Sequence, residues 1–557
     1  LVVTNAGIQC RGNTSLTQKP RSFNLVFNAF VPGQKLLDLE RINLNADVND
    51  PSMARPKLIN DLHNAAGVPT PYANHVALVV SNTTYHYSFF DAVRNNTQPI
   101  DDVFLHQRFG TDRGNLYKCL YVDMPASLSY LGPTGTSYSA HGSTYALRFC
   151  GAGDASYDDL AGFVSLINNT SSNDFPTAIL GAFEVDEFLQ NLALDVLTGH
   201  WDDYWINANN YHLFFNAETR RWTYLPYDFD NTFDIRWYNA DWANQNVYAW
   251  TNISEGPHEA PLASRLMAVP EFRKRYAFYM KRMLDNLFTY SSESAQAFAI
   301  RSNLVAALPF QDAVSVANMK GQERSNYGGC WPYWSYDQFY WSYTDGQSDY
   351  SGVPDERGIL PFVSARVSSA YSQLGTLANI APVLSDFAMV PGLPRTNDAV
   401  AVSIQAFDDV AVTNVSFYYS FQGGATNVAE MTLQADGSYA AVLPAFGATG
   451  TVRYLVRARD SSGQSTFHPY GGSNYAASVD IGSAAFDLVV TELNYNPYGL
   501  TAAETAAGLT DPQALEFVEL YNAGNAPLNL TGFQLQNGIS ATFPAFVLTN
   551  GTYAVVV

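Results

Sequence analysis

The stretch between residues 199 and 232 decides the fold of the first part of the chain. Residues 199–204 read Gly-His-Trp-Asp-Asp-Tyr, residues 209–214 read Asn-Asn-Tyr-His-Leu-Phe, and residues 222–232 read Trp-Thr-Tyr-Leu-Pro-Tyr-Asp-Phe-Asp-Asn-Thr. Ahead of this stretch, apolar residues at positions 185, 188, 189, 192, 196 and 197 follow the three-to-four spacing of a buried helix face. The pattern therefore predicts a buried helix that ends at Gly199, a polar loop, and two strands joined by a short hairpin.

The predicted hairpin brings carboxylates and a carboxamide to one edge. These are Asp202 and Asp203 in the loop, Asn210 at the start of one strand, and Asp228 and Asp230 after the other. Carboxylate and amide oxygens are the ligands that Mg²⁺ prefers. A phosphoryl-transfer enzyme needs such a site and a carboxylate that accepts the proton of the acceptor hydroxyl. Asp and Asn also cap helices and form turns, and a structural Ca²⁺ site is a second alternative.

The motifs resemble those of the CotH (spore-coat protein H) kinase family over about residues 1–375. The family's Asn/His-x-Asp, Asn-Tyr-x-Leu-Tyr and Pro-Trp-Asp-x-Asp-x-x-Phe are similar to the runs at 200–202, 210–214 and 226–233. Its opening Arg-Gly-Asn-Ser-Ser and Lys-Lys-Ser-Tyr-x-Leu are similar to residues 11–15 and 19–25. The chain departs from the pattern at Pro20-Arg21 in place of a Lys pair, at Tyr227 in place of Trp and at Asp234 in place of Gly.

The resemblance implies a divergent α+β protein-kinase-like domain that uses ATP and Mg²⁺ or Mn²⁺ to phosphorylate Ser or Thr of other proteins. It implies Asp203 or its neighbour Asp202 as the catalytic base. Asn210, Asp228 and Asp230 are the implied metal ligands. The candidates for contacts with the nucleotide phosphates are Arg11, Lys19, Arg21 and Lys118, and their alternative role is plain surface charge.

The texture of the sequence changes near residue 380. Residues 1–380 mix helical and strand patterns, with helices expected at 57–66, 185–197, 261–287 and 292–308. Residues 381–484 show alternating strands and turn signals, which predict an Ig-like or fibronectin-like β-sandwich. Residues 485–557 resemble a lamin-tail domain, also an Ig-like sandwich, on the motifs at 490–494, 516–522 and 530–535. This domain is expected to be truncated, and any signal peptide to lie outside the sequence.

Charge is distributed unevenly along the chain. The net charge is −21, and residues 1–150 hold 12 Lys and Arg against 10 Asp and Glu, while the remainder holds 18 against 41. An acidic chain argues against nucleic-acid binding, because phosphate backbones need an excess of Lys and Arg. A polyphosphate ligand would need a divalent cation and the basic first segment. The sequence also lacks a run of about 18 apolar residues, so no transmembrane segment is expected.

The four cysteines, at positions 10, 119, 150 and 330, have no zinc-type spacing. Cys119 follows one predicted strand and Cys150 ends another, so a disulfide is expected between them if the two strands are neighbours. Such a bond would fit an extracellular or cell-surface protein.

The two resemblances together imply a secreted or surface protein kinase that acts on extracellular or coat proteins, with β-domains that attach it to a cell wall or surface. The alternative is a non-catalytic surface adhesin or scaffold with a kinase-like head. Intact Asp203, Asn210 and Asp228 favour the kinase, and the β-domains favour the adhesin.

Overall fold

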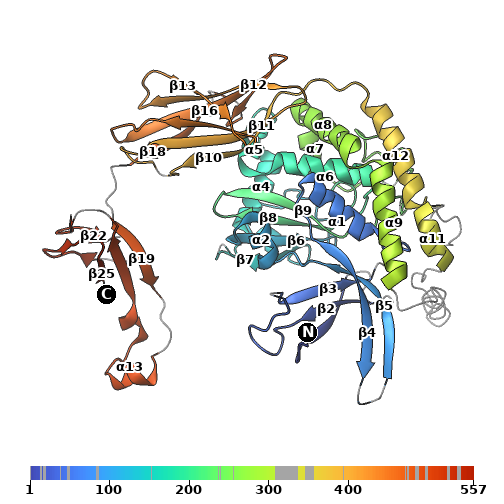
Figure 1. The fold of residues 1–557 in the computed structure, drawn as a ribbon, viewed down its shortest axis with the longest axis horizontal. Helices are drawn as coiled ribbons and strands as arrows, with labels where there is room; N and C mark the ends of the chain where they lie inside the picture. The colour runs from blue at the N-terminus through green and yellow to red at the C-terminus, as the bar shows by residue number, and fades with distance from the viewer. Residues whose placement is uncertain are drawn as a thin grey trace. The chain divides into compact units, whose positions relative to one another are not determined.

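A computed structural model of the chain separates into two compact units, residues 1–381 and 382–557 (Figure 1). The residues that the structure describes are 2–12, 16, 21–37, 39–46, 50–82, 84, 87–151, 153–235, 238, 240–254, 256–307, 336–344, 357–392, 394–470, 472, 476–482, 488–495, 500–523, 527–535 and 541–556.

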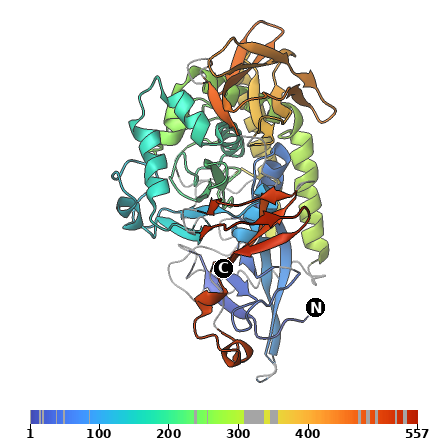
Figure 2. The same ribbon diagram turned by 90° about the vertical axis from the view of Figure 1, so that its left-hand side faces the viewer.

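The first unit opens with a five-stranded antiparallel sheet in the order β1-β2-β3-β5-β4. The strands are β1 (Gly7–Arg11), β2 (Ser22–Val26), β3 (Arg41–Asn45), β4 (Ala73–Asn82) and β5 (Tyr87–Thr97), and helix α1 (Arg55–Ala66) lies between β3 and β4 in the chain. Figures 1 and 2 show β4 and β5 as a long hairpin that projects from the unit. Arg11 is the last residue of the edge strand β1, opposite Ser22.

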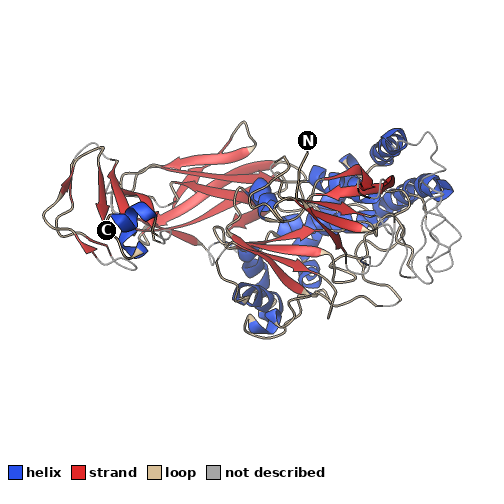
Figure 3. Ribbon diagram, turned by 90° about the horizontal axis from the view of Figure 1, so that it is seen from below, coloured by secondary structure: helices blue, strands red, loops and turns tan. Residues whose placement is uncertain are grey.

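A second antiparallel sheet has the order β7-β6-β8-β9. Figure 3 shows the strands of the chain in red and the helices in blue. It consists of β6 (Gly114–Cys119), β7 (Tyr145–Cys150), β8 (Tyr211–Asn216) and β9 (Arg221–Pro226). The predicted hairpin is confirmed, since β8 pairs with β9 and Tyr211 faces Pro226. Lys118 on β6 faces His212 on β8. The sheet therefore brings Lys118 close to the end of the hairpin that carries the polar residues.

The disulfide predicted between Cys119 and Cys150 is wrong, although their strands are neighbours. In the antiparallel register Cys119 faces Tyr145 and Cys150 faces Asn115, so the cysteines occupy opposite ends of the β6–β7 pair. Both thiols are free. Cys119 is buried, and burial raises the pKa of its thiol.

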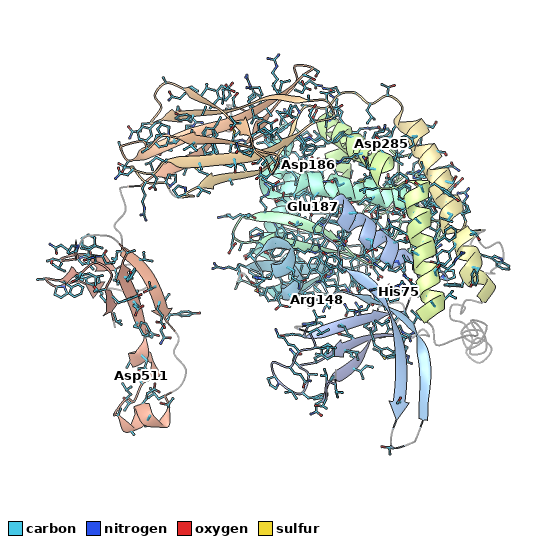
Figure 4. All side chains as sticks on the ribbon, viewed as in Figure 1. His75, Arg148, Asp186, Glu187, Asp285 and Asp511 are labelled. Carbon is cyan, nitrogen blue, oxygen red and sulfur yellow. The ribbon has the colours of Figure 1, made fainter. Side chains whose placement is uncertain are left out.

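Helix α6 (Val185–Thr198) is the centre of the helical layer, as its periodicity predicts. Eleven of its residues are buried, and it packs against α1, α8 (Pro270–Asn286) and α12 (Ile359–Leu374) (Figures 1 and 2). Asp186 and Glu187 lie at its start (Figure 4). Asp186 accepts hydrogen bonds from Arg275 at 3.0 Å and Tyr279 at 2.8 Å, which ties α6 to α8.

The helix predicted over 261–287 is two helices, α7 (Pro261–Ala268) and α8, because Pro270 cannot donate a backbone hydrogen bond and starts a new helix. The other two predicted helices are confirmed as α1 and α9 (Tyr290–Ala307). The remaining described helices of the unit are α2 (Asp102–Phe109), α3 (Thr136–Ser139), α4 (Asp158–Asn169), α5 (Phe175–Ala182) and α11 (Tyr336–Thr344). None of the helices in the described ranges is long and apolar enough to cross a membrane.

The second unit is built of antiparallel β-sheets. In residues 382–482 one sheet has the order β10-β11-β15-β14 and the other β13-β12-β16-β17, with β18 also paired to β16. Their shared core includes Val402, Ile404, Phe417 and Val456. The bounds are β10 (Val383–Val390), β11 (Val400–Phe407), β12 (Val412–Phe421), β13 (Asn427–Glu430), β14 (Thr432–Leu433), β15 (Ser438–Leu443), β16 (Gly450–Asp460), β17 (Ser465–His468) and β18 (Ala477–Ile481).

The described residues of 488–556 form three small antiparallel sheets. A three-stranded sheet has the order β19-β20-β25, and the two-stranded sheets are β21-β24 and β22-β23. The elements are β19 (Leu488–Asn494), α13 (Ala502–Ala506), η4 (Pro512–Leu515), β20 (Phe517–Asn522), β21 (Leu528–Asn529), β22 (Gln534–Leu535), β23 (Ala541–Thr542), β24 (Val547–Leu548) and β25 (Tyr553–Val556).

Candidate functional site

The loop after α6 and the end of the β8–β9 hairpin lie side by side. Gly199 ends α6 with a φ of 70°, and a Cβ at this position would lie 2.8 Å from the ring of Phe362, so glycine meets both requirements of the turn. The backbone N–H of Tyr227 donates to the carbonyl oxygen of Asn210 at 3.1 Å. This bond brings Asp228 beside Asn210, and both residues have positive φ angles, 69° and 56°.

Asp202 is held by four carboxamides. Its Oδ1 accepts from the Nδ2 atoms of Asn207 at 2.5 Å and Asn209 at 2.9 Å, and its Oδ2 accepts from those of Asn210 at 2.9 Å and Asn231 at 3.1 Å. Burial raises the pKa of Asp202, and the hydrogen bonds from Asn209 and Asn207 oppose that effect. The carboxylate is therefore fixed in orientation at the place where the loop meets the hairpin.

Asp203 faces the opposite way, into the core, and is 1% exposed. Its Oδ1 accepts from the backbone N–H of Ile206 at 2.9 Å, and its backbone carbonyl accepts from the N–H groups of Asn207 and Asn209. Its Oδ2 has no partner. Burial, reinforced by the charge of Asp195, raises the pKa of Asp203 to about 8. Asp203 thus shapes the loop from behind, whereas Asp202 lies on the side of Asn210.

A buried layer behind the loop connects helix α6 to the residue after Asp228. His200 approaches Asp195 Oδ1 with Nδ1 at 3.1 Å. Burial lowers the pKa of His200, but the hydrogen bond and charge of Asp195 outweigh it and the pKa is raised. The ring of Phe229 lies 5.4 Å from that of His200 and 4.7 Å from that of His63 on α1. This packing anchors the residue next to Asp228 and leaves Asp228 itself exposed.

Two cations face Asp228 from different sheets. Arg11 of β1 donates to the hydroxyl of Tyr227 at 2.6 Å and also to Asn45. The ammonium of Lys118 lies 5.0 Å from the centre of the Tyr227 ring. Burial, followed by the charge of Arg11, lowers the pKa of Lys118 to about 8, and the carboxylate of Asp228 acts in the opposite direction. Arg148 on β7, labelled in Figure 4, also lowers this pKa.

The residues present fit a metal that is shared with a ligand. Asp228 is exposed, and neither its carboxylate nor Asn210 Oδ1 takes part in a hydrogen bond within the described part of the chain. Asp230, half-buried, lies two residues further on. Over the same described residues, no three His, Cys, Asp or Glu side chains gather into a metal site. A cation here would need phosphate oxygens to complete its shell, which is the usual way Mg²⁺ is bound.

The remaining predicted phosphate contacts are not brought together in the same way. Arg21 is exposed and donates to the sulfur of Cys10 at 3.8 Å. Lys19 lies outside the described residues. Sequence reasoning missed the carboxamides that hold Asp202, namely Asn207, Asn209 and Asn231. The signal was the density of Asn after Asp202, since a buried carboxylate needs several donors.

Asp234 has a physical reason for standing where the family pattern has glycine. Its φ is 67°, the left-handed region that Gly adopts freely and that Asp tolerates better than most residues. The side chain is fully buried, and the guanidinium of Arg357 lies 3.6 Å from its Oδ2. The backbone conformation that glycine would provide is therefore available to Asp234.

The first unit mixes helices with two antiparallel sheets, and the polar site lies between these two sheets. The sequence model of the CotH kinase protein family matches residues 8–323. The match covers more than half of the 557 residues, and the chain belongs to this family.

Curated relatives carry coat and invasin names. Inner spore coat protein H of Bacillus subtilis (strain 168) is 25% identical over 286 residues, 51% of this chain and 72% of that protein. Invasin CotH3 of Rhizopus delemar is 21% identical over 52% of this chain and 46% of that protein. Invasin CotH7 of the same fungus is 25% identical over 32% of this chain and 28% of that protein. The chain therefore spans less than half of each invasin.

Among solved structures, a DNA-bound alkylpurine DNA glycosylase AlkC of Pseudomonas fluorescens matches with a TM-score of 0.13 at 12% identity. The match covers 63% of this chain and 85% of that one. A match at this TM-score gives no information about the fold or function of this chain.

Proposed function

We propose that this protein is an atypical protein kinase that transfers the γ-phosphate of ATP to Ser or Thr side chains of coat or surface proteins. One observation carries the proposal: Asp202, Asn210 and Asp228 meet at one edge, facing the cations Arg11 and Lys118. Family membership supports the reaction, and the names of the relatives support a coat or surface location. We also assign a kinase-like fold to the first unit, and Ig-like and lamin-tail folds to residues 382–482 and 488–556.

In this proposal the site's own residues have separate roles. Asp202 accepts the proton of the acceptor hydroxyl while the hydroxyl oxygen bonds to the γ-phosphorus. The bond from that phosphorus to the β–γ bridging oxygen breaks, and ADP leaves. Lys118 and Arg11 attract the phosphate oxygens. Asp228 and Asn210 would hold the divalent cation, which would supply positive charge against the phosphate oxygens.

The assignment of the base goes to Asp202 rather than Asp203 for a geometric reason. Asp203 is 1% exposed and serves the backbone of its own loop, so an acceptor hydroxyl has no access to it. Asp202 is half-buried and accepts hydrogen bonds from four side-chain amides, one of which must give way to the acceptor hydroxyl. We expect the amide of Asn231 to give way, because its hydrogen bond to Asp202, at 3.1 Å, is the longest of the four.

The test is phosphate transfer from γ-labelled ATP to the protein itself or to surface and coat extracts, with and without Mg²⁺ or Mn²⁺. The proposal expects transfer only with the metal, and none from Asp228→Asn. Undiminished transfer by that variant would overturn it.

The alternative function is a non-catalytic surface adhesin. The invasin names of two relatives favour it, and a first unit that binds no nucleotide with any divalent cation would support it. Asp202, Asn210 and Asp228 would then be turn-forming residues only.

A further inference from the structure

Away from this site, three large side chains meet in the interior of the first unit. Trp242 and Trp250 come from the segment after Asp241, and Arg366 comes from α12. The two indole rings lie 4.8 Å apart, and the guanidinium carbon of Arg366 lies 5.4 Å from the Trp250 ring. All three side chains are 0% exposed. We call these three residues the buried donor site.

Four nitrogen atoms of the buried donor site have no hydrogen-bond partner. They are the Nε1 atoms of Trp242 and Trp250 and the Nε and one terminal nitrogen of Arg366. The other terminal nitrogen donates to the carbonyl of Gln245 at 2.7 Å. Buried polar groups in folded proteins nearly always have a partner. Four orphan donors on three touching residues therefore point to a ligand.

The carbonyl groups nearby already accept hydrogen bonds, and a carbonyl oxygen that accepts one bond has one lone pair left for a further donor. The amide of Gln245 donates to those of Ala249, Trp250 and Asn252, and the hydroxyl of Tyr276 donates to that of Val247 at 2.7 Å. A water molecule at the buried donor site would accept hydrogen bonds but would also need acceptors for its own two hydrogens. A ligand that only accepts does not have this need.

Charge points in the same direction. Burial lowers the pKa of Arg366 to about 10, so its guanidinium stays charged at neutral pH. Among the described residues no carboxylate forms an ion pair with Arg366. The charge of Asp241, which accepts a hydrogen bond from Arg357 at 2.6 Å, acts on Arg366 from beyond ion-pair distance and opposes the lowering of its pKa by burial. A buried charge without an adjacent counter-charge is unfavourable, and an anion in contact with the guanidinium removes much of that cost.

We propose that Trp242, Trp250 and Arg366 form a buried binding site for a small monovalent anion, with chloride as its physiological occupant. Chloride accepts several N–H hydrogen bonds, carries the charge that balances the guanidinium, and has no hydrogens of its own. Because Arg366 belongs to α12 and the two tryptophans to residues 242–250, the bound anion would fasten this segment to the helix.

The first test is made on the full chain without mutation. Thermal unfolding is followed in sodium chloride, sodium bromide and sodium gluconate at equal sodium concentration. Because gluconate is too large to be enclosed, we expect the halides alone to raise Tm, by roughly 3 °C at about a hundred times the dissociation constant. Equal Tm values in all three salts would overturn the proposal.

The second test locates the anion. A crystal grown in bromide should show one anomalous peak within hydrogen-bond distance of Arg366 and both indole nitrogens. Water, or nothing, at that place would contradict the proposal.

Variants add a control. Arg366→Met should fold and lose the halide dependence, since replacing a buried charge by an apolar side chain is often neutral. If it does not fold, Trp250→Phe removes a single donor and should weaken the halide effect several-fold. Trp201→Phe is the matched control, because the Trp201 indole donates to the carbonyl of Ile235 at 2.5 Å. It should lower Tm and keep the full halide effect, and a Trp250→Phe protein that also keeps the full effect would count against the site.

Discussion

The polar residues at the 200–210 loop and the adjoining end of the β8–β9 hairpin form two groups. One group faces outwards and the other faces the core, and the two groups have different roles. On the outer side, Asp228 is exposed with its carboxylate unbonded among the described residues, and the Asp202 carboxylate is oriented by carboxamides. On the inner side, Asp203 and His200 are 1% exposed and serve the backbone and Asp195. The role of each acid at this site therefore depends on which side of the loop its carboxylate faces. Asp202 and Asp203 are adjacent in the sequence, so the sequence alone does not distinguish their roles.

The largest effect expected is from Asp228→Asn on the outer side. The substitution keeps volume but removes an exposed carboxylate beside Asn210 that has no hydrogen bond to any described residue, so metal-dependent nucleotide binding and transfer should both disappear. Circular dichroism and Tm should stay close to those of the unmodified protein, because Asp228 stabilises no described neighbour through a hydrogen bond. Isothermal titration with ATP and Mg²⁺ measures the loss of nucleotide binding. Retained binding would show that Asp228 does not hold the metal.

A smaller effect is expected from Lys118, whose pKa is about 8. Phosphate binding favours the protonated form, so ATP affinity should be constant below pH 8 and fall up to tenfold per pH unit as pH rises above it. Lys118→Met should weaken ATP binding by about 10–100-fold at pH 7, the range for a charge-assisted hydrogen bond. Lys118→Arg should bind ATP as tightly at pH 9 as at pH 7, because arginine stays protonated. If its ATP affinity falls above pH 8 as in the unmodified protein, Lys118 is not the group that titrates.

Glu293 is a third kind of acid, one whose carboxyl group is buried away from the site. It is 1% exposed, neither of its oxygens has a partner, and burial raises its pKa to about 8. A carboxyl with a raised folded-state pKa destabilises the protein when it must ionise. Stability should therefore fall as pH rises from about 4.5 towards 8.

Glu293→Gln should remove that fall and raise the free energy of unfolding at pH 7.5 by about 3–4 kcal/mol, with little change at pH 4.5. Urea unfolding at the two pH values measures it. Equal stability of the two proteins at pH 7.5 would show that Glu293 is solvated.

The smallest effect expected is from removal of residues 382–557. The first unit has its own buried core around α6, and every residue assigned to the site belongs to it. ATP affinity of residues 1–381 should therefore equal that of the full chain within error. A folded first unit with weakened affinity would mean that the β-unit contributes to the site.

Local periodicity made α6 and the β8–β9 hairpin predictable, since each follows a repeat of its own along the chain. The meeting of Asp202, Asn210 and Asp228 followed from that hairpin. The side that Asp203 faces did not, because a loop has no period that assigns neighbouring residues to a face. Strand register was equally hidden, and it is the antiparallel β6–β7 register that separates Cys119 from Cys150.

Single-turnover phosphate transfer by Asp202→Asn and Asp203→Asn, compared side by side at saturating ATP and Mg²⁺, tests this account most directly. Asp202→Asn should lower the rate by about 10²–10⁴-fold, the range for loss of a general base, with little change in ATP affinity. Asp203 is largely protonated at neutral pH by its raised pKa, so Asp203→Asn should stay within about tenfold of the unmodified rate. The reverse order, with Asp203→Asn inactive and Asp202→Asn active, would contradict the assignment of the outer side as the catalytic one.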